Sequence, residues 1–168
     1  MILLRALRAE DSNFMMEYIN DDEISSNFKF TRYPFSQEGF RNFIEMSWSD
    51  NTNIHFAIEA DEYAGTISLK NINKIDRTAE YAIVVRKKFW GTGTAKEATE
   101  KIIQYGFNTL NLEKIYLNVL SSNARANKFY QKMGFDFEGT FRKHVFVDGK
   151  YEDLNWYCIF KKKDDKEN

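Results

Sequence analysis

The chain has 168 residues, which predicts one domain with room for a sizeable core, and its 24 Lys and Arg against 25 Asp and Glu leave a net charge of −1. A chain with this charge balance is not expected to bind nucleic acid through a general excess of positive charge. Its single cysteine excludes a disulfide framework and a cysteine-based zinc site, so no metal is expected. No apolar run approaches the ~18 residues of a membrane span and no secretory signal is evident, so we expect a cytoplasmic protein without membrane contact.

The first half of the chain predicts a strand, two helices and three more strands. Residues 2–7 form the first strand, and Asp11 and Ser36 are expected to cap the two helices. Each helix has one apolar face at helical spacing, made by Phe14, Met15, Tyr18 and Ile19 in the first and by Phe40, Phe43, Ile44 and Trp48 in the second. The three strands are expected at 54–59, 64–72 and 79–86, with a hairpin joining the first two.

The second half predicts helices and strands in alternation, then a hairpin. The helix after Gly93 has an apolar stripe of Ala95, Ala98, Ile102 and Tyr105, and a strand follows at 115–120. Asn123 is expected to cap the next helix, whose apolar face is Ala126, Phe129, Tyr130 and Met133, and Gly134 to end it. Strands at 136–147 and 151–160 flank Asp148-Gly149, a strong hairpin signal. The order predicts an α+β or mixed α/β domain over 1–163, with a solvated tail at 164–168.

A glycine-containing loop lies between a strand and a helix, in the run Phe89-Trp90-Gly91-Thr92-Gly93-Thr94-Ala95-Lys96. Such a loop lets the backbone approach a pyrophosphate at a helix N-terminus, although a tight turn without a ligand would look the same. It lacks the Gly-Lys-Ser/Thr triple of a Walker loop. It also lacks the third glycine of a dinucleotide fingerprint, which argues against a nucleotide-dependent oxidoreductase.

A second motif follows this loop in the sequence, and the two together indicate what the loop binds. The strand at 115–120 leads to the Asn123-capped helix, which ends in Tyr130-x-x-x-Gly134-Phe135. Together the two motifs resemble the GNAT superfamily of N-acetyltransferases, closely over residues 79–139. The resemblance implies a mixed sheet of about seven strands with four helices. Its fourth and fifth strands, here 79–86 and 115–120, would splay apart to admit acetyl-CoA.

The resemblance also implies a cosubstrate site for acetyl-CoA. The pyrophosphate would lie on the backbone of Trp90, Gly91, Thr92, Gly93, Thr94, Ala95 and Lys96. Ile83, Val84 and Val85 would pair with the pantetheine arm, and Asn123 would contact it from the other side. The family usually begins the loop with Arg or Gln where this chain has Trp90, so the resemblance does not extend to help from that side chain in binding the phosphates.

Acetyl transfer from a thioester to an amine requires a base for the amine and an acid for the leaving thiolate. An alkyl amine has a pKa near ~10 and must lose a proton before it attacks a thioester, and Glu80 stands where similar enzymes place a carboxylate base. Tyr130 resembles the family's general acid for the leaving thiolate. The alternatives are a solvent-facing glutamate and a core tyrosine. A backbone N–H of the splayed strand would meet the developing oxyanion.

The acceptor is left open by the sequence. The chain is similar to a branch that holds polyamine, ribosomal-protein N-terminal and amino-sugar acetyltransferases, so a small-molecule amine or a peptide N-terminus is expected, and a homo-oligomer is compatible with either. Thr31 and Arg32 stand where polyamine members have acids, which argues against a regulatory polyamine site. A non-catalytic acetyl-CoA-binding module is the alternative function. We favour catalysis because such a module needs neither Glu80 nor Tyr130. His55, His144 and Cys158 are expected to be structural or exposed.

Overall fold

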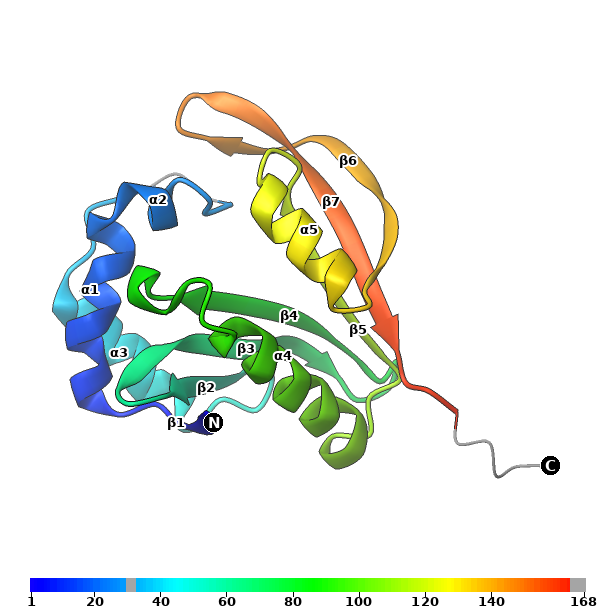
Figure 1. The fold of residues 1–168 in the computed structure, drawn as a ribbon, viewed down its shortest axis with the longest axis horizontal. Coiled ribbons are helices and arrows are strands. Elements are labelled where there is room, and N and C mark those ends of the chain that lie inside the picture. Colours follow the sequence, from blue (N-terminus) through cyan, green and yellow to red (C-terminus); the bar gives the residue numbers. More distant parts are fainter. Residues whose placement is uncertain (30–32, 164–168) are drawn as a thin grey trace.

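The computed structural model describes residues 1–29 and 33–163. Its centre is a seven-stranded sheet of order β1-β2-β3-β4-β5-β7-β6 (Figure 1). The strands are β1 (Leu3–Ala6), β2 (Ile54–Glu59), β3 (Tyr63–Asn73), β4 (Thr78–Val85), β5 (Lys114–Leu120), β6 (Asp136–Val147) and β7 (Lys150–Phe160). The helices are α1 (Ser12–Asn20), α2 (Asp22–Ser25), α3 (Gln37–Ser47), α4 (Thr94–Gln104) and α5 (Ala124–Lys132). The predicted mixed sheet is confirmed.

The number of helices differs from the prediction. Four were expected, and the described part of the chain has five α-helices because the short α2 lies in what looked like a loop. Asp21 begins α2 by accepting hydrogen bonds from the main-chain N–H groups of Glu23 and Ile24. A helix of one turn has no apolar period, so the sequence pattern could not indicate it.

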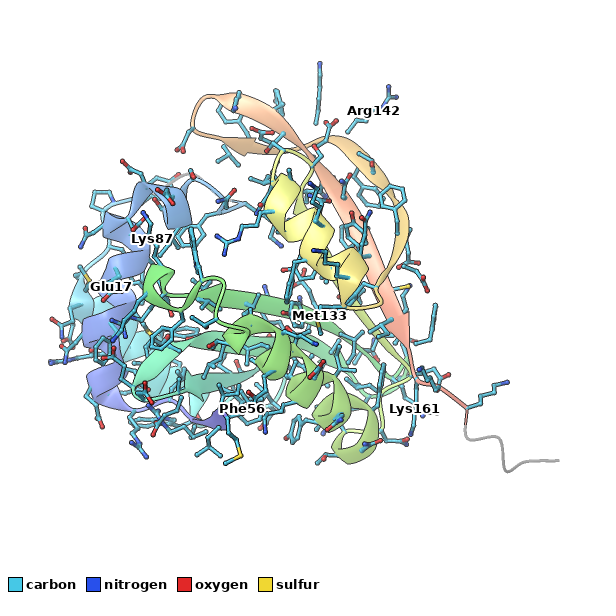
Figure 2. The ribbon with its side chains drawn as sticks, in the orientation of Figure 1. Glu17, Phe56, Lys87, Met133, Arg142 and Lys161 are labelled. Carbon is cyan, nitrogen blue, oxygen red and sulfur yellow. The ribbon has the colours of Figure 1, made fainter. Side chains whose placement is uncertain are left out.

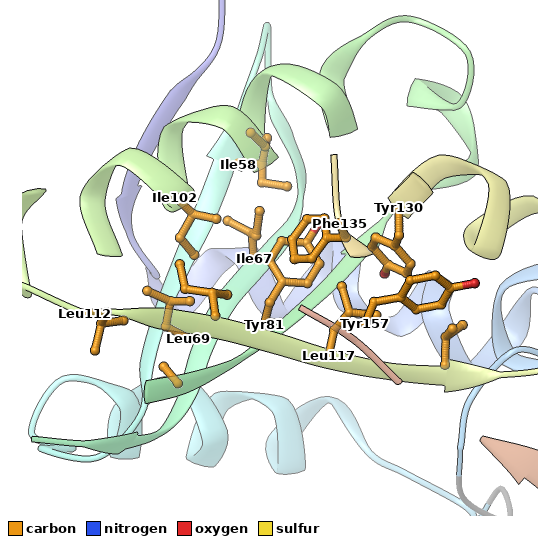
Figure 3. Close-up of a cluster of buried hydrophobic side chains, with 14 of the residues drawn as sticks. Ile58, Ile67, Leu69, Tyr81, Ile102, Leu112, Leu117, Tyr130, Phe135 and Tyr157 are labelled. Atoms are coloured by element: carbon orange, nitrogen blue, oxygen red, sulfur yellow. The ribbon is translucent and has the colours of Figure 1, made fainter. Parts of the chain in front are cut away.

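Helices cover both faces of the sheet, each over its own core. On one face, Ala98 and Ile102 of α4 pack with Tyr130 of α5 against strand side chains (Figure 3). On the other, Met15 and Tyr18 of α1 join Ile44 of α3 in a second buried cluster. Side chains alternate along a strand, so neighbouring residues of one strand serve opposite cores.

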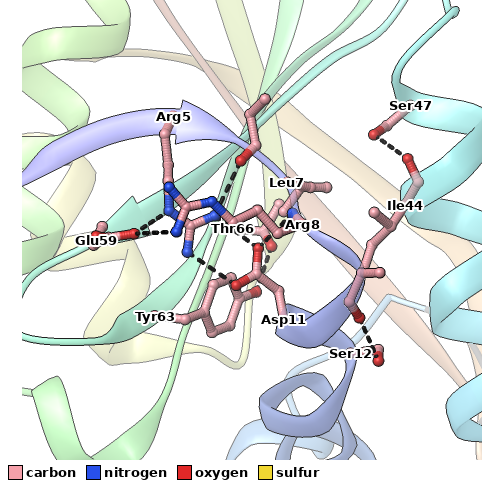
Figure 4. Close-up of polar contacts among 12 residues, drawn as sticks. Arg5, Leu7, Arg8, Asp11, Ser12, Ile44, Ser47, Glu59, Tyr63 and Thr66 are labelled. Carbon is pink, nitrogen blue, oxygen red and sulfur yellow. Dashed lines mark hydrogen bonds and ion pairs between the residues drawn. The ribbon is translucent and has the colours of Figure 1, made fainter.

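Two of the three expected caps form as predicted. The Ser36 side chain accepts a hydrogen bond from the Gly39 N–H at 3.1 Å, and Asn123 accepts one from the Ala126 N–H at 3.2 Å. Asp11 stands at the start of α1, but its side chain makes no capping bond there. The buried Asp11 carboxylate instead pairs with the Arg5 guanidinium at 2.8 and 2.9 Å and accepts the Arg8 N–H at 2.8 Å (Figure 4). An ion pair with Arg5 has replaced the expected cap.

The apolar face of α3 ends earlier than predicted. Ile44 is fully buried, whereas Trp48 follows the helix and is 57% exposed. The Trp48 indole N–H reaches the Leu7 carbonyl at 2.8 Å, so its edge is held while its ring faces solvent.

The parallel pair β4 and β5 separates along its length. The strands pair from Thr78↔Lys114 to Glu80↔Tyr116. Beyond Glu80, β4 still pairs with β3 as far as Val85, and β5 still pairs with β7 as far as Leu120. The two strands therefore diverge toward their C-terminal ends (Figure 1), and this confirms the predicted splay.

An ion pair fixes the far end of β4. Arg86, just after β4, is buried and binds Glu17 of α1 at 2.8 Å, while its guanidinium also donates to the Tyr63 carbonyl at 2.6 Å. This holds β4 to the helices of its own side, away from β5. Glu17 and Lys87, the residue after Arg86, lie on the same side of the molecule in Figure 2. Within the described residues, no helix combines the length and hydropathy that crossing a membrane requires.

Candidate active site

The loop before α4 has the geometry of a phosphate cradle. Gly91 and Gly93 have φ of 73° and 85°, a region that favours glycine, and apart from the adjoining residues no atom lies within 4 Å of a Cβ placed at either position. Gly93 is the N-cap of α4 and supplies no side-chain cap, which leaves N–H groups of the first turn free for an anion. The residues present therefore fit the pyrophosphate of acetyl-CoA.

Side chains on both sides stabilise this loop. Thr92 donates to the Phe89 carbonyl at 2.7 Å and bonds the Thr94 hydroxyl at 2.8 Å. The Trp90 indole N–H donates to the Val85 carbonyl at 2.9 Å, so it is committed to the end of β4. The Arg125 guanidinium of α5 lies 4.1 Å from the centre of the Trp90 ring. It brings a cation to the loop where the family's usual Arg or Gln is missing, and no local sequence pattern predicts this contact.

The edge of β4 that faces the splay is open. Ile83, Val84 and Val85 pair with β3 on one side, and pairing with β5 has ended before them. An extended arm such as pantetheine has unpaired main-chain groups to bind there. Asn123 lies across the splay, at the start of α5, where its side-chain oxygen caps Ala126. The pantetheine contacts of these residues remain predictions.

Glu80 lies at the last paired position before the splay. Asn118 of β5 donates a hydrogen bond to one Glu80 carboxylate oxygen at 2.8 Å. Lys70 of β3 pairs with the other oxygen at 3.1 Å, and the Glu80 side chain is only 12% exposed. The alternative of a solvent-facing strand glutamate is therefore not what the structure has.

The surroundings of Glu80 keep it ionised. Partial burial raises the pKa of the carboxyl, but the charge of Lys70, the charge of Lys29 and the Asn118 amide outweigh burial. The pKa of Glu80 accordingly lies below its ordinary value. The carboxylate is therefore in the ionised form that a base needs at neutral pH, and its low pKa makes it a weak base that passes the proton on readily.

Tyr130 is buried in an aromatic cluster beside the splay. Its ring packs edge-on against Tyr81 of β4, with centroids 5.7 Å apart, and lies tilted against Tyr157 of β7 with centroids 6.3 Å apart (Figure 3). Burial raises the pKa of its hydroxyl, so Tyr130 stays protonated. Within the part of the chain that is described, no side chain or carbonyl hydrogen-bonds that hydroxyl. Tyr130 is thus a core residue by packing and also an unengaged proton donor.

Glu80 and Tyr130 lie on opposite faces of the sheet, on either side of the gap between β4 and β5. Glu80 and Tyr81 are neighbours on β4, so their side chains point to opposite faces, and Tyr130 packs on Tyr81. One face then offers a carboxylate and the other a hydroxyl to a group lying between β4 and β5. The arrangement suits proton removal on one side of a reacting carbon and proton delivery on the other.

Several residues on the Glu80 face were not identified from the sequence. Tyr116 pairs with Glu80, Asn118 lies two residues along β5, and Trp156 of β7 pairs with Asn118. The Tyr116 and Trp156 rings stack with centroids 6.1 Å apart. Strand alternation could have placed Tyr116 and Asn118 on this face, whereas the arrival of Lys29 beside Asn118 depends on the fold.

The remaining candidates lie elsewhere. His55 bonds the Ser68 hydroxyl at 2.6 Å in a half-buried strand position, His144 is exposed, and Cys158 is buried. No group of three or more His, Cys, Asp or Glu in the described residues is placed to hold a metal ion. Residues 31 and 32, which bear on a regulatory polyamine site, and the tail at 164–168 lie outside the described residues.

Comparison with known proteins places this geometry in a family. Residues 1–136 match the acetyltransferase (GNAT) domain. The chain is 34% identical over 166 residues to the spermidine N(1)-acetyltransferase of Escherichia coli K12, covering 95% of this chain and 86% of that protein. It is 28% identical over 168 residues to a putative ribosomal N-acetyltransferase of Bacillus subtilis, covering 96% and 92%.

A solved structure agrees with both. The spermidine N-acetyltransferase of Vibrio cholerae, crystallised with CoA and spermine, superposes with a TM-score of 0.85 at 31% identity over 95% of each chain. These similarities confirm the predicted branch, fold and cosubstrate. They favour an enzyme over a non-catalytic binding module.

Proposed function

This chain belongs to the GNAT acetyltransferase family and transfers the acetyl group of acetyl-CoA to an amine; we propose that the amine is a polyamine, with Glu80 as base and Tyr130 as acid. The observation that carries the proposal is the ionised Glu80 carboxylate, held by Asn118 at the point where β4 and β5 separate. The similarity to spermidine acetyltransferases supports the acceptor class.

The Glu80 face suits an alkylammonium chain. Aromatic faces attract such cations, and the stacked Tyr116 and Trp156 lie on the same face as Glu80. The carboxylate can bind one ammonium group of a flexible polyamine, while the methylene groups of the polyamine pack on the neighbouring aromatic rings. A peptide N-terminus would need main-chain partners in addition.

The proton transfers follow from the two faces. Glu80 accepts a proton from the incoming ammonium, directly or through a water molecule, and the neutral nitrogen attacks the thioester carbon. Unpaired main-chain N–H groups of β4 beyond Glu80 stabilise the charge on the carbonyl oxygen. As the intermediate collapses, the nitrogen releases its second proton to solvent, and Tyr130 donates its proton to the departing sulfur and regains one from solvent. The Glu80 proton leaves to water, and the site is restored.

A panel of amines assayed by thiol release from acetyl-CoA tests this proposal. Spermidine, spermine, glucosamine and a dipeptide with a free N-terminus cover the acceptor classes of the branch. We expect the highest kcat/KM with spermidine or spermine. A clear preference for glucosamine or the dipeptide would overturn the polyamine assignment and leave acetyl transfer standing.

A further inference from the structure

One lysine of the chain reaches into the reaction site from outside the sheet. Lys29 follows α2, and its side chain crosses to β5, 89 residues away in the sequence. Its ammonium donates to the Asn118 carbonyl at 3.2 Å and also to the Asn118 side-chain oxygen. The same Asn118 side chain donates to Glu80, so Lys29 and Glu80 share one partner.

The Asn118 carbonyl faces the splay. Main-chain groups of a strand point alternately to its two neighbours. Along β5 and its ends, the Ser121 N–H bonds the Asp153 carbonyl at 3.0 Å and the Glu113 carbonyl accepts the Lys161 N–H at 2.9 Å, so odd-numbered residues face β7. Asn118, an even position, therefore faces β4, which has already turned away. The Lys29 nitrogen thus lies at the open edge of β5.

The surroundings of Lys29 lower the pKa of its ammonium group. Burial lowers the pKa of the ammonium, the charge of Lys70 lowers it further, and Glu80 acts in the opposite direction without restoring it. A lower pKa makes it easier for this amine to lose a proton to the nearby carboxylate, the step that an acceptor amine must undergo before it attacks.

We propose that Lys29 is a built-in acceptor and that the enzyme acetylates it within its own chain when acetyl-CoA is bound and no external amine is present. This rests on the proposed function, because it uses the same base and the same thioester. The Lys29 nitrogen forms a bond to the acetyl carbon as the carbon–sulfur bond breaks. The ammonium gives one proton to Glu80 before the attack and a second proton to water after it, and the sulfur takes a proton from Tyr130 and leaves as CoA thiol, so atoms and electrons balance without a further reactant.

Peptide mass spectrometry after incubation with acetyl-CoA alone tests the proposal. We expect the initial rate of acetylation at Lys29 to be about 10-fold or more higher than at the exposed Lys74 and Lys128, because proximity makes the reaction at Lys29 intramolecular. The rate should not depend on protein concentration, spermidine should suppress it, and Glu80→Gln should slow it at Lys29 alone. Lys29→Arg should remove the acetylated peptide and leave the slow background at the two control lysines.

The outcomes separate the two proposals. Lys29 occupancy no higher than that of Lys74 and Lys128, in a preparation that acetylates spermidine, would overturn self-acetylation and leave the proposed function intact. Occupancy that rises in proportion to protein concentration would also overturn it, because the transfer would then run between molecules. Absence of thiol release with every amine would overturn both.

Discussion

The Asn118 side-chain amide, two residues beyond the last paired position of β5, donates a 2.8 Å hydrogen bond back to Glu80 of β4. This contact fixes the carboxylate at the beginning of the splay. It also leaves the Asn118 oxygen to Lys29, so base, positioning amide and built-in amine form one connected group. A change to any member should therefore be felt at Glu80.

Replacing Lys70 should move the acid limb of the pH profile. The Lys70 charge helps to keep the pKa of Glu80 low, so Lys70→Met raises that pKa. Because Glu80 works as a base only when ionised, activity should then begin to fall at a higher pH as the medium is acidified. The measurement is kcat/KM against pH on one amine. The exposed Lys74→Met serves as control and should leave the limb in place; an unmoved limb in Lys70→Met would mean that Glu80 does not set it.

Removing the Tyr130 hydroxyl should slow turnover without harming the fold. No described residue bonds that hydroxyl, so Tyr130→Phe should keep both its packing on Tyr81 and its thermal unfolding temperature. We expect kcat to fall by roughly 10²-fold or more, the usual scale for a lost general acid, with CoA affinity unchanged. The exposed Tyr151→Phe provides the comparison. Normal turnover in Tyr130→Phe would reduce Tyr130 to a packing residue.

A side chain at Gly93 should block the phosphate cradle. Gly93 and Gly149 have nearly equal φ, 85° and 87°, and both have open space at the side-chain position. Valine at either strains the backbone alike, so Gly149→Val in the β6–β7 hairpin corrects for strain. Titration calorimetry should show CoA affinity reduced about tenfold or more in Gly93→Val only, because phosphate hydrogen bonds are lost. Equal affinity in the two variants would place the pyrophosphate elsewhere.

Much of the structure around this site could be predicted from the sequence because it is determined by interactions between residues close together in the chain. The caps at Ser36 and Asn123 and the hairpin at Asp148-Gly149 follow from side chains acting on nearby backbone. The position of Glu80 followed from its place at the beginning of a strand in a recognisable family pattern. Its predicted role, with that of Tyr130, awaits the measurements above.

The rest depends on contacts between distant residues. The sequence predicts that Asp11 caps a helix, but in the folded chain its carboxylate pairs with Arg5, and no local pattern indicates this pairing. Lys29 lies in a loop that is rich in aromatic residues, and only the folded chain shows that it meets Asn118. The stacking of Arg125 on Trp90 likewise joins two elements that the sequence separates.

The most direct test of the central claim is kcat/KM against pH for wild type and Glu80→Gln on spermidine. Glutamine keeps the size of Glu80 and removes only its basicity, and the exposed Glu45→Gln controls for a general loss of charge. We expect a loss of about 10²-fold near neutral pH that shrinks as pH rises toward the amine pKa of ~10, where the substrate no longer needs a base. A loss of the same factor at every pH, or no loss, would contradict the assignment of Glu80 as the base.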